Sequence, residues 1–176
     1  LVHASMIDAC RLSEAKLVRF AHNDAAALEA RLEQYAGAEG RKLIITESVF
    51  SMDGDLAPLK EIAALADRYD AMLMIDEAHS TGTFGPNGAG LIREYGLETS
   101  VTVSMGTLSK ALAGFGGFAA CSEKLRSLLV HSARAFIYTT APPPAVVGAA
   151  LGALDVLDAS PNLGNILQAN ADYFRS

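Results

Sequence analysis

The chain has 176 residues, of which 51% are hydrophobic, which suffices for one domain with a substantial core or for most of a larger one. Its formal net charge of −6 at pH 7 argues against a nucleic-acid partner, because proteins that bind nucleic acids present a basic face. No apolar run approaches the roughly 18 residues of a membrane span and residues 1–5 lack the pattern of a signal peptide, so we expect no membrane partner.

The first 70 residues alternate predicted helices and strands. Residues 17–20 are typical of a short strand, and residues 42–46 of a buried one. Asn23 or Asp24 can cap a first helix, and Pro58 suits the first turn of a second. Apolar residues at helical spacing mark the inner faces of these helices: Leu28, Leu32 and Tyr35 in the first, and Leu59, Ile62, Ala66 and Tyr69 in the second.

Residues 72–75 are large and apolar and lead directly into Asp76, with His79 three positions later. A short continuous apolar run fits a strand that is buried on both faces of a parallel sheet. Asp76 would then lie at the carboxyl end of this strand, where open α/β sheets bind their ligands. The alternative is a structural role for Asp76 as a helix N-cap, because aspartate often begins the helix after a strand.

The second half of the chain continues the alternation. Residues 101–104 are predicted to form a strand, and residues 114–117 a tight turn before an extended segment. Ser122 can cap a further helix. A helix opened by prolines at 142–144 and running to about Asp158 has no polar face, so we expect it to be buried. The whole pattern predicts an α/β fold, with a mostly parallel sheet and helices on both faces.

Residues 104–110 form a second informative stretch, in which a strand is followed by glycine, two hydroxyl residues and Lys110. A lysine that is held among apolar groups is more easily deprotonated, which makes Lys110 a candidate Schiff-base nucleophile. The flanking Gly106, Thr107 and Ser109 could bind a phosphate beside it. The ordinary alternative is an exposed surface lysine.

Cysteine and histidine usage gives little support to other chemistries. Cys10 and Cys121 lie far apart in the sequence, which is typical of a reducing compartment, so we expect a cytoplasmic protein. No Cys-x-x-Cys, His-x-His or His-Glu-x-x-His pattern occurs, and no metal site is predicted. His22 and His131 have no evident role.

Asp76, His79, Thr107 and Lys110 could lie around one cofactor at the carboxyl edge of the sheet. Pyridoxal 5'-phosphate fits this set, because it requires a lysine for its aldehyde, a carboxylate for its ring nitrogen and donors for its phosphate. The motifs resemble those of the α-oxoamine synthases, a family of fold-type I pyridoxal-phosphate enzymes. The resemblance rests on several stretches: Asp-Glu-Ala-His-Ser-Thr-Gly at 76–82, Ser-Lys at 109–110, His-Ala-Ser at 3–5, Phe-Ser-Met-Asp-Gly-Asp at 50–55, Gly-Phe-Gly-Gly at 114–117 and the run at 133–143.

This resemblance implies a role for each matching residue. Lys110 matches the lysine that binds the cofactor covalently and moves the substrate's α-proton, and Asp76 matches the acid on the ring nitrogen. His3 matches the histidine that stacks on the ring. The other matches lie near the ring hydroxyl or the phosphate: Ser51 and His79 at the hydroxyl, Thr107 at the phosphate, and Thr139 and Thr140 at the phosphate of the partner subunit.

The resemblance also implies an activity and an assembly. The expected reaction is a decarboxylative condensation of L-alanine with a pimeloyl thioester of CoA or a carrier protein, in biotin biosynthesis, catalysed by a homodimer with shared sites. Glycine C-acetyltransferase, or another α-oxoamine synthase, is the alternative. The family has a segment before His3 and a C-terminal small domain. Residues 1–159 are therefore expected to be the large domain without its N-terminal part, and residues 160–176 the linker and the start of the small domain.

Two other classes of protein remain as competing interpretations. An apolar strand that ends in Asp-Glu-Ala-His is also the Walker B pattern of helicases, but that reading needs a Gly-Lys pair in an upstream phosphate loop, and the sequence has none. A remnant that binds partners without a cofactor is the other, and the presence of both Asp76 and Lys110 speaks against it.

Overall fold

A four-stranded sheet organises the computed structural model, which describes residues 2–176. Its order is β1 (Lys42–Glu47), β2 (Ala71–Asp76), β3 (Val103–Thr107) and β4 (Gly117–Cys121). The first three strands pair in parallel, and β4 runs antiparallel to β3. The prediction of a mostly parallel sheet is therefore confirmed.

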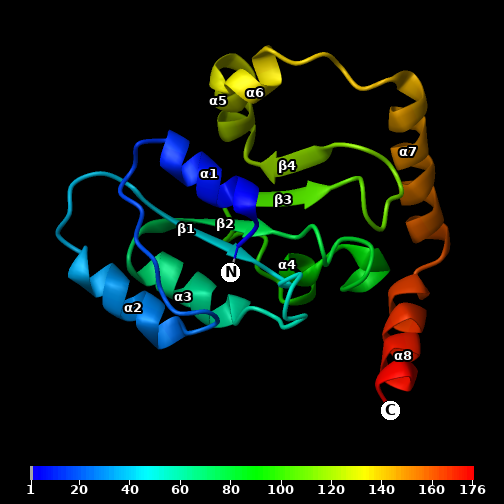
Figure 1. Cartoon of the computed structure of the whole chain (residues 1–176), viewed down its shortest axis with the longest axis horizontal. Coiled ribbons are helices and arrows are strands. Elements are labelled where there is room, and N and C mark those ends of the chain that lie inside the picture. Colours follow the sequence, from blue (N-terminus) through cyan, green and yellow to red (C-terminus); the bar gives the residue numbers. More distant parts are fainter. Residues whose placement is uncertain (1) are drawn as a thin grey trace.

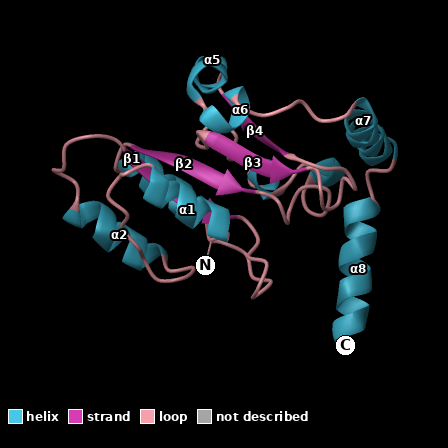
Figure 2. Ribbon diagram, turned by 45° about the horizontal axis from the view of Figure 1, so that its top comes forward, coloured by secondary structure: helices cyan, strands magenta, loops and turns pink. Residues whose placement is uncertain are grey.

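Helices cover both faces of the sheet. In Figure 1, α2 (Ala25–Gln34) and α3 (Leu59–Arg68) lie on one face, and α1 (Ala4–Leu12) lies across the other. Figure 2 shows α1 in front of the strands from a second direction. The remaining helical elements follow in chain order: the 3-10 turn η1 (Pro86–Gly88), α4 (Leu91–Glu94), α5 (Glu123–Ser132), α6 (Arg134–Ile137), α7 (Pro144–Ala159) and α8 (Leu163–Arg175).

The core lies between the sheet and the α2–α3 layer. Leu73 and Ile75 on β2 are fully buried and pack with Ile44 and with the inner faces of both helices. Burial of each such side chain is worth about 1.5–3 kcal/mol, which fixes which face of β2 turns inward. Of the two residues that the sequence allows as the cap of α2, Asn23 and Asp24, it is Asp24 that accepts the Ala27 N–H, at 2.8 Å.

Strand alternation then determines which side chains face away from this core. Because successive side chains point to opposite faces, Glu47 and Asp76 lie on the face opposite to Ile44, Leu73 and Ile75. The register pairs Glu47 with Asp76, and Asp76 with Met105. Two acids therefore end neighbouring strands on the face that carries α1.

Two strand predictions need correction. Residues 17–20 form no strand and lie in the loop between α1 and α2, where Phe20 packs against the core while Leu17 is exposed. A strand requires a hydrogen-bonded neighbour, and no described segment pairs with these residues. The strand predicted at 101–104 instead spans Val103–Thr107. The Thr102 side chain accepts the N–H of Leu73, and the Thr102 backbone N–H donates to the Leu73 carbonyl. The paired ladder with β2 then begins at Val103, opposite Met74.

The prediction that the proline-initiated helix is buried is also wrong. Ala150 is the buried residue of α7, whereas Val147, Leu151, Leu154 and Val156 are 45–59% exposed. The helix lies beyond the sheet in Figure 1 and contacts the η1 turn. The exposed apolar side chains of α7 therefore do not pack against the core that the described residues form.

The turn that precedes α4 generates a first prediction, which concerns Gly90. This residue is buried at φ +95°, and a Cβ built there would lie 2.4 Å from Glu77 Oε2. Gly90→Ala should therefore destabilise the protein by about 2–4 kcal/mol, from backbone strain together with overpacking. Urea unfolding monitored by circular dichroism measures this change.

Gly148→Ala is the matched control. Gly148 lies within α7, where an added Cβ meets no atom within 4 Å. Replacement of a helical glycine by alanine should stabilise the protein by about 0.5–1 kcal/mol. Equal effects of the two substitutions would contradict the close approach of Gly90 to Glu77.

Candidate active site

The candidate site lies at the carboxyl ends of β1, β2 and β3. Asp76 is the last residue of β2 and is only 5% exposed. Its Oδ1 accepts the Ala78 N–H at 2.8 Å, as the side chain of a helix N-cap would, although a turn rather than an α-helix follows. The alternative of a structural role as an N-cap is therefore partly correct. This bond leaves further acceptor capacity on the carboxylate for a ligand.

His79 and Lys110 meet beside Asp76 although 31 residues separate them in the sequence. Lys110 Nζ lies 2.8 Å from His79 Nε2. Burial and the neighbouring Lys110 charge lower the pKa of His79, with a smaller contribution from His3, while the Asp76 carboxylate acts in the opposite sense. The imidazole is therefore held neutral, and can accept a hydrogen bond from an ammonium group.

The apolar surroundings that the sequence predicts for Lys110 are not found. The side chain is exposed rather than held among apolar groups, and His79 is its polar neighbour. The physical reason is its place after the end of β3, in the loop that leads to β4 at the open edge of the sheet. Its amine is thus accessible to a ligand.

Thr107 ends β3 and organises this loop. Its hydroxyl donates to the Gly116 carbonyl at 3.0 Å, and lies 2.6 Å from Ser109 Oγ and 3.2 Å from the Ser109 N–H. The Leu108 N–H also donates to Gly116, and the Gly114 N–H donates to Leu108. The loop therefore presents two hydroxyl groups close to Lys110, as a phosphate subsite would require.

His3 reaches the site from the start of α1. It is the N-cap of this helix, and its Nδ1 lies 2.8 Å from Ser5 Oγ. The charge of His3 lowers the pKa of both His79 and Glu47. We call His3, Asp76, His79 and Lys110 the His79 cluster, because contacts and charge interactions with His79 connect its members.

Glu47 is a buried acid of the site that lies one residue beyond the strand predicted at 42–46. It ends β1, is 4% exposed and stands beside Asp76 in the register. Burial, and then the Asp76 charge, raise its pKa, whereas hydrogen bonds from the backbone of His3 and Ser51 lower it. A signal for it was available, because Glu47 follows the apolar run at 43–45 after one residue, Thr46, and Asp76 directly follows the apolar run at 72–75.

A second buried acid, Glu77, stabilises the turn that follows β2. Glu77 Oε1 accepts the Ser80 hydroxyl at 2.9 Å and the Ile92 N–H at 3.0 Å. Burial raises the pKa of Glu77. Ser80 Oγ in turn lies 2.9 Å from Ser48 Oγ, and the Ser48 N–H donates to the Asp76 carbonyl at 2.9 Å. This network fixes the turn that directs His79 toward Lys110.

Two of the predicted residues are not brought into the cluster. Thr139 and Thr140 are exposed in the segment between α6 and α7, and no hydrogen bond found among residues 2–176 joins them to it. Ser51 is also exposed, and it lies in the loop that follows β1, the strand that ends in Glu47.

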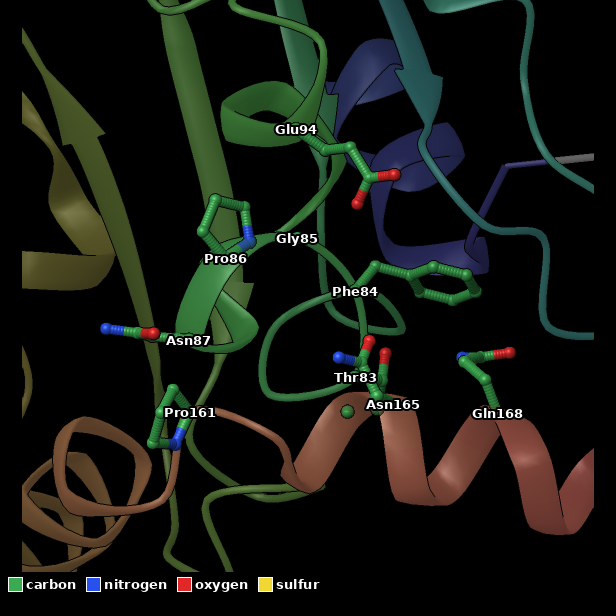
Figure 3. Close-up of a pocket in the computed structure, with 10 residues that line it drawn as sticks. Thr83, Phe84, Gly85, Pro86, Asn87, Glu94, Pro161, Asn165 and Gln168 are labelled. Atoms are coloured by element: carbon green, nitrogen blue, oxygen red, sulfur yellow. The ribbon is translucent and has the colours of Figure 1, made fainter.

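Other polar features lie apart from the cluster. A cleft of about 470 Å³ lies between α8 and the turn after Ser80, and none of the cluster residues lines it. Figure 3 shows Asn165 and Gln168 of α8 on one side of this cleft, and Thr83 and Phe84 on the other. His22 lies 2.9 Å from Asp55 and 3.8 Å from Asp53. These three groups are close enough to hold a metal ion, but the Asp55 side chain is 41% exposed and also binds Asn23.

Comparison with known families gives a match along the entire chain. The model of the family described as aminotransferase class I and II matches residues 1–176. The 8-amino-7-oxononanoate synthase of Geobacter metallireducens is 47% identical over 178 residues, which cover 99% of this chain and 45% of that protein. The enzyme of Geobacter sulfurreducens is 50% identical over 158 residues, covering 90% of this chain and 40% of its own length. The chain thus spans less than half the length of these relatives.

Solved structures share the fold. Serine palmitoyltransferase from Sphingomonas wittichii has a TM-score of 0.85 and 38% identity, covering 93% of this chain and 40% of its own. The 8-amino-7-oxononanoate synthase from Francisella tularensis has a TM-score of 0.79 and 34% identity, covering 98% of this chain and 49% of its own. A further serine palmitoyltransferase structure contains pyridoxal phosphate, with a TM-score of 0.88, 39% identity and coverage of 97% of this chain and 42% of its own.

The contact between Lys110 and His79 predicts a measurable titration. In the cofactor-free protein, the pKa of His79 should lie below its ordinary value, and Lys110→Met should raise it, because the substitution removes a neighbouring positive charge. The unfolded chain then binds more protons near pH 6 than the folded chain, so this residue's contribution to stability should decline as the pH falls below about 6.5. Proton NMR titration of the imidazole measures both shifts.

Lys60→Met provides the control for this titration. Lys60 lies on α3, over the ring of Tyr95, and makes no contact with the cluster. Its removal should leave the His79 titration unchanged. A His79 pKa that responds equally to both substitutions would mean that the Lys110 contact is not its cause.

Proposed function

The chain belongs to the aminotransferase class I and II family, and from this premise we propose that it forms the cofactor-binding part of an acyltransferase that condenses L-alanine with a pimeloyl thioester. The family resemblance drawn from the motifs is confirmed, and the fold is that of the fold-type I pyridoxal-phosphate transferases. The observation that carries the proposal is the 2.8 Å contact between Lys110 and His79 beside the buried Asp76.

The donor set of the site suits pyridoxal phosphate. It offers an accessible amine on Lys110, a buried carboxylate on Asp76 and paired hydroxyl groups on Thr107 and Ser109. These groups match the aldehyde, ring nitrogen and phosphate of the cofactor in turn. His3 would lie against the ring, and Ser51 and His79 near its hydroxyl. Residues 1–159 would then be the large domain, and residues 160–176 the linker and the start of a small domain.

Each side chain has a task in the proposed reaction. Bound pyridoxal phosphate would supply an aldehyde that captures amines and a ring that withdraws electrons from the adjacent carbon. Asp76 would hold a proton on the ring nitrogen, since a carboxylate there favours the charged ring. Lys110 would hold the cofactor and then take the α-proton of alanine, and the neutral His79 would orient the lysine amine. The new carbon–carbon bond joins the α-carbon to the acyl carbon, with loss of CO2 and release of the thiol.

The site would be completed by a second subunit. Thr139 and Thr140 are exposed and follow exposed apolar residues of α6, including Phe136 and Ile137. An apolar surface of this kind is typical of an interface between subunits. In the proposed homodimer, each chain offers its two threonines to the phosphate of the other. We also propose a cytoplasmic location, with which two free cysteines are consistent. Among residues 2–176, no helix is long and apolar enough to cross a membrane.

A second candidate differs in its substrates. The serine palmitoyltransferase structures are 38–39% identical to this chain, whereas the solved 8-amino-7-oxononanoate synthase is 34% identical. Serine with a long-chain acyl thioester is therefore the candidate to test against alanine, and glycine with acetyl-CoA represents the remaining α-oxoamine synthases. The relatives at 47–50% identity favour alanine.

The proposed reaction predicts which amino acid loses its α-proton. In the protein supplied with pyridoxal phosphate, solvent deuterium should enter L-alanine faster than glycine or L-serine, as followed by NMR. Lys110→Ala should slow this exchange by about 10²–10⁴-fold, because it removes the proton-transfer group. Preferential exchange of serine or glycine would replace the proposed substrate with that of the second candidate.

Lys124→Ala serves as the control for this exchange. Lys124 is exposed on α5 and takes no part in the proposed site. The exchange of alanine should remain at the wild-type rate. Borohydride reduction followed by peptide mapping should place the pyridoxyl group on Lys110, and a label on Lys42, Lys60 or Lys124 would refute the assignment.

The shared site predicts complementation between two inactive variants. Chains with Lys110→Ala are mixed with chains that carry both Thr139→Ala and Thr140→Ala. In a mixed dimer one site carries every lesion and the other carries none, so an equal mixture should recover about a quarter of wild-type activity. If native mass spectrometry detects mixed dimers but activity does not exceed that of the parents, the threonines serve their own chain.

A further inference from the structure

The loop that follows β1 is closed by its own backbone. The Phe50 N–H donates to the Asp55 carbonyl at 3.0 Å, and the Gly54 N–H donates to the Phe50 carbonyl at 2.8 Å. The turn between them begins at Ser51 and is exposed. We call residues 50–55 the Ser51 loop. Because two internal backbone bonds join its ends, the loop moves as a unit, and the position of its exposed turn depends on what holds those ends.

The chain on either side of this loop is held at the candidate site. Ser48, which follows β1, is fully buried, and its N–H donates to the Asp76 carbonyl at 2.9 Å. The Ser48 hydroxyl donates to the same carbonyl at 3.2 Å. After the loop, the Ala57 N–H donates to the Ser48 carbonyl at 3.1 Å. The chain therefore leaves and rejoins the sheet beside the backbone of Asp76.

Two adjacent residues before α2 hold the other side of the loop. Asn23 Nδ2 donates to Asp55 Oδ2 at 2.6 Å and to the Leu56 carbonyl at 3.1 Å. His22 Nε2 lies 2.9 Å from the same Asp55 oxygen. The His22 ring also packs edge-on against the buried Phe50, with 4.4 Å between the ring centroids. We call His22 and Asn23 the clamp, because they contact the first and the last residue of the loop.

The clamp is fixed to the core and depends on its own contacts. Asp24, the next residue in the chain, caps α2, whose Leu28 and Leu32 are buried in the core. Asn23 adopts a left-handed backbone with φ +54°, which asparagine tolerates better than most residues. Asp55 Oδ1 is buried and has no hydrogen-bond partner among residues 2–176, so this carboxylate relies on the bonds to its Oδ2.

We propose that the clamp holds the Ser51 loop in place through Asp55, and that its two residues are positioning residues of the site. The loop is joined to α2 at Asp55 and to the Asp76 backbone through Ser48. The clamp therefore determines where the Ser51 hydroxyl lies relative to Asp76. The inference rests on the proposed function in naming pyridoxal phosphate as the group that Ser51 would contact, whereas the contacts of the clamp belong to the chain itself.

The first test measures hydrogen exchange of backbone amides in the cofactor-free protein. Asn23→Gly removes the side-chain amide and suits the left-handed backbone at this position. The Phe50 and Gly54 amides should then exchange at least about 10-fold faster, because the closed loop opens more often. The Ser48 amide, which is bonded to Asp76, should keep its rate. Unchanged loop amides, or equal acceleration at Ser48, would overturn the proposal.

Histidine variants provide the matched control. His22→Leu removes the contact with Asp55 and should accelerate the same loop amides, whereas His22→Gln keeps a donor and should be affected less. His131→Leu should change none of them, because His131 is exposed on α5 and bonds to the Ser127 carbonyl of its own helix. If EDTA accelerates loop exchange in the wild type as strongly as His22→Leu does, a metal ion holds the loop and the proposal fails.

A double-mutant cycle tests whether the clamp acts through Ser51. The protein is titrated with pyridoxal phosphate, and the bound cofactor is followed by its visible absorbance. Asn23→Gly should weaken binding by about 3–10-fold, the worth of one hydrogen bond. In a Ser51→Ala background the same substitution should have no further effect, because the clamp then has no hydroxyl to position. Effects that multiply would overturn the proposal.

Failure of the proposed function would be recognised separately. If the wild type binds no pyridoxal phosphate, or exchanges serine or glycine in preference to alanine, the proposed function or its substrate is refuted. The exchange of the Phe50 and Gly54 amides in Asn23→Gly still tests the clamp in that case, because it requires no cofactor.

Discussion

The parallel pairing of β1, β2 and β3 is the constraint on which the site depends. Parallel strands end at the same edge of a sheet, so Glu47, Asp76 and Thr107 are gathered although 60 residues separate the first from the last. The buried side chains of Leu73 and Ile75 fix the inward face of β2. A shift of register by one residue would turn Asp76 into the core and remove it from the site.

Buried charge at this edge is stabilised by backbone groups rather than by ion pairs. Asp76 accepts the Ala78 N–H, and Glu77 accepts the Ile92 N–H. The ion pairs with an arginine, such as Arg68 with Glu29, lie on exposed surfaces, where they contribute little. Rigid backbone donors leave the side chains of His3, His79 and Lys110 free to meet a ligand.

The exposed apolar surfaces of the C-terminal third set this region apart from the core. Residues of α6 and α7 that would be buried in a self-contained domain face solvent, including Phe136 and Leu151. Glycine at 164 lets α8 approach the Thr83 carbonyl, where an added Cβ would lie 2.8 Å away. Helices α7 and α8 therefore attach to the sheet domain through the η1 turn, whereas α6 packs against α5, and the apolar side chains of α6 and α7 stay exposed.

The strands at 42–46 and 72–75, the cap at Ser122 and the candidate residues Asp76, His79 and Lys110 could be predicted from the sequence, because these features depend on local periodicity and on motifs of adjacent residues. The sequence did not determine that residues 17–20 lack a strand partner, that α7 is exposed, or that Lys110 is accessible and meets His79. The strand predicted at 42–46 also stopped one residue short of Glu47, which ends β1. The burial of Glu47 beside Asp76 depends on the register of β1 with β2, and that register is set by the packing of residues that lie far apart in the sequence.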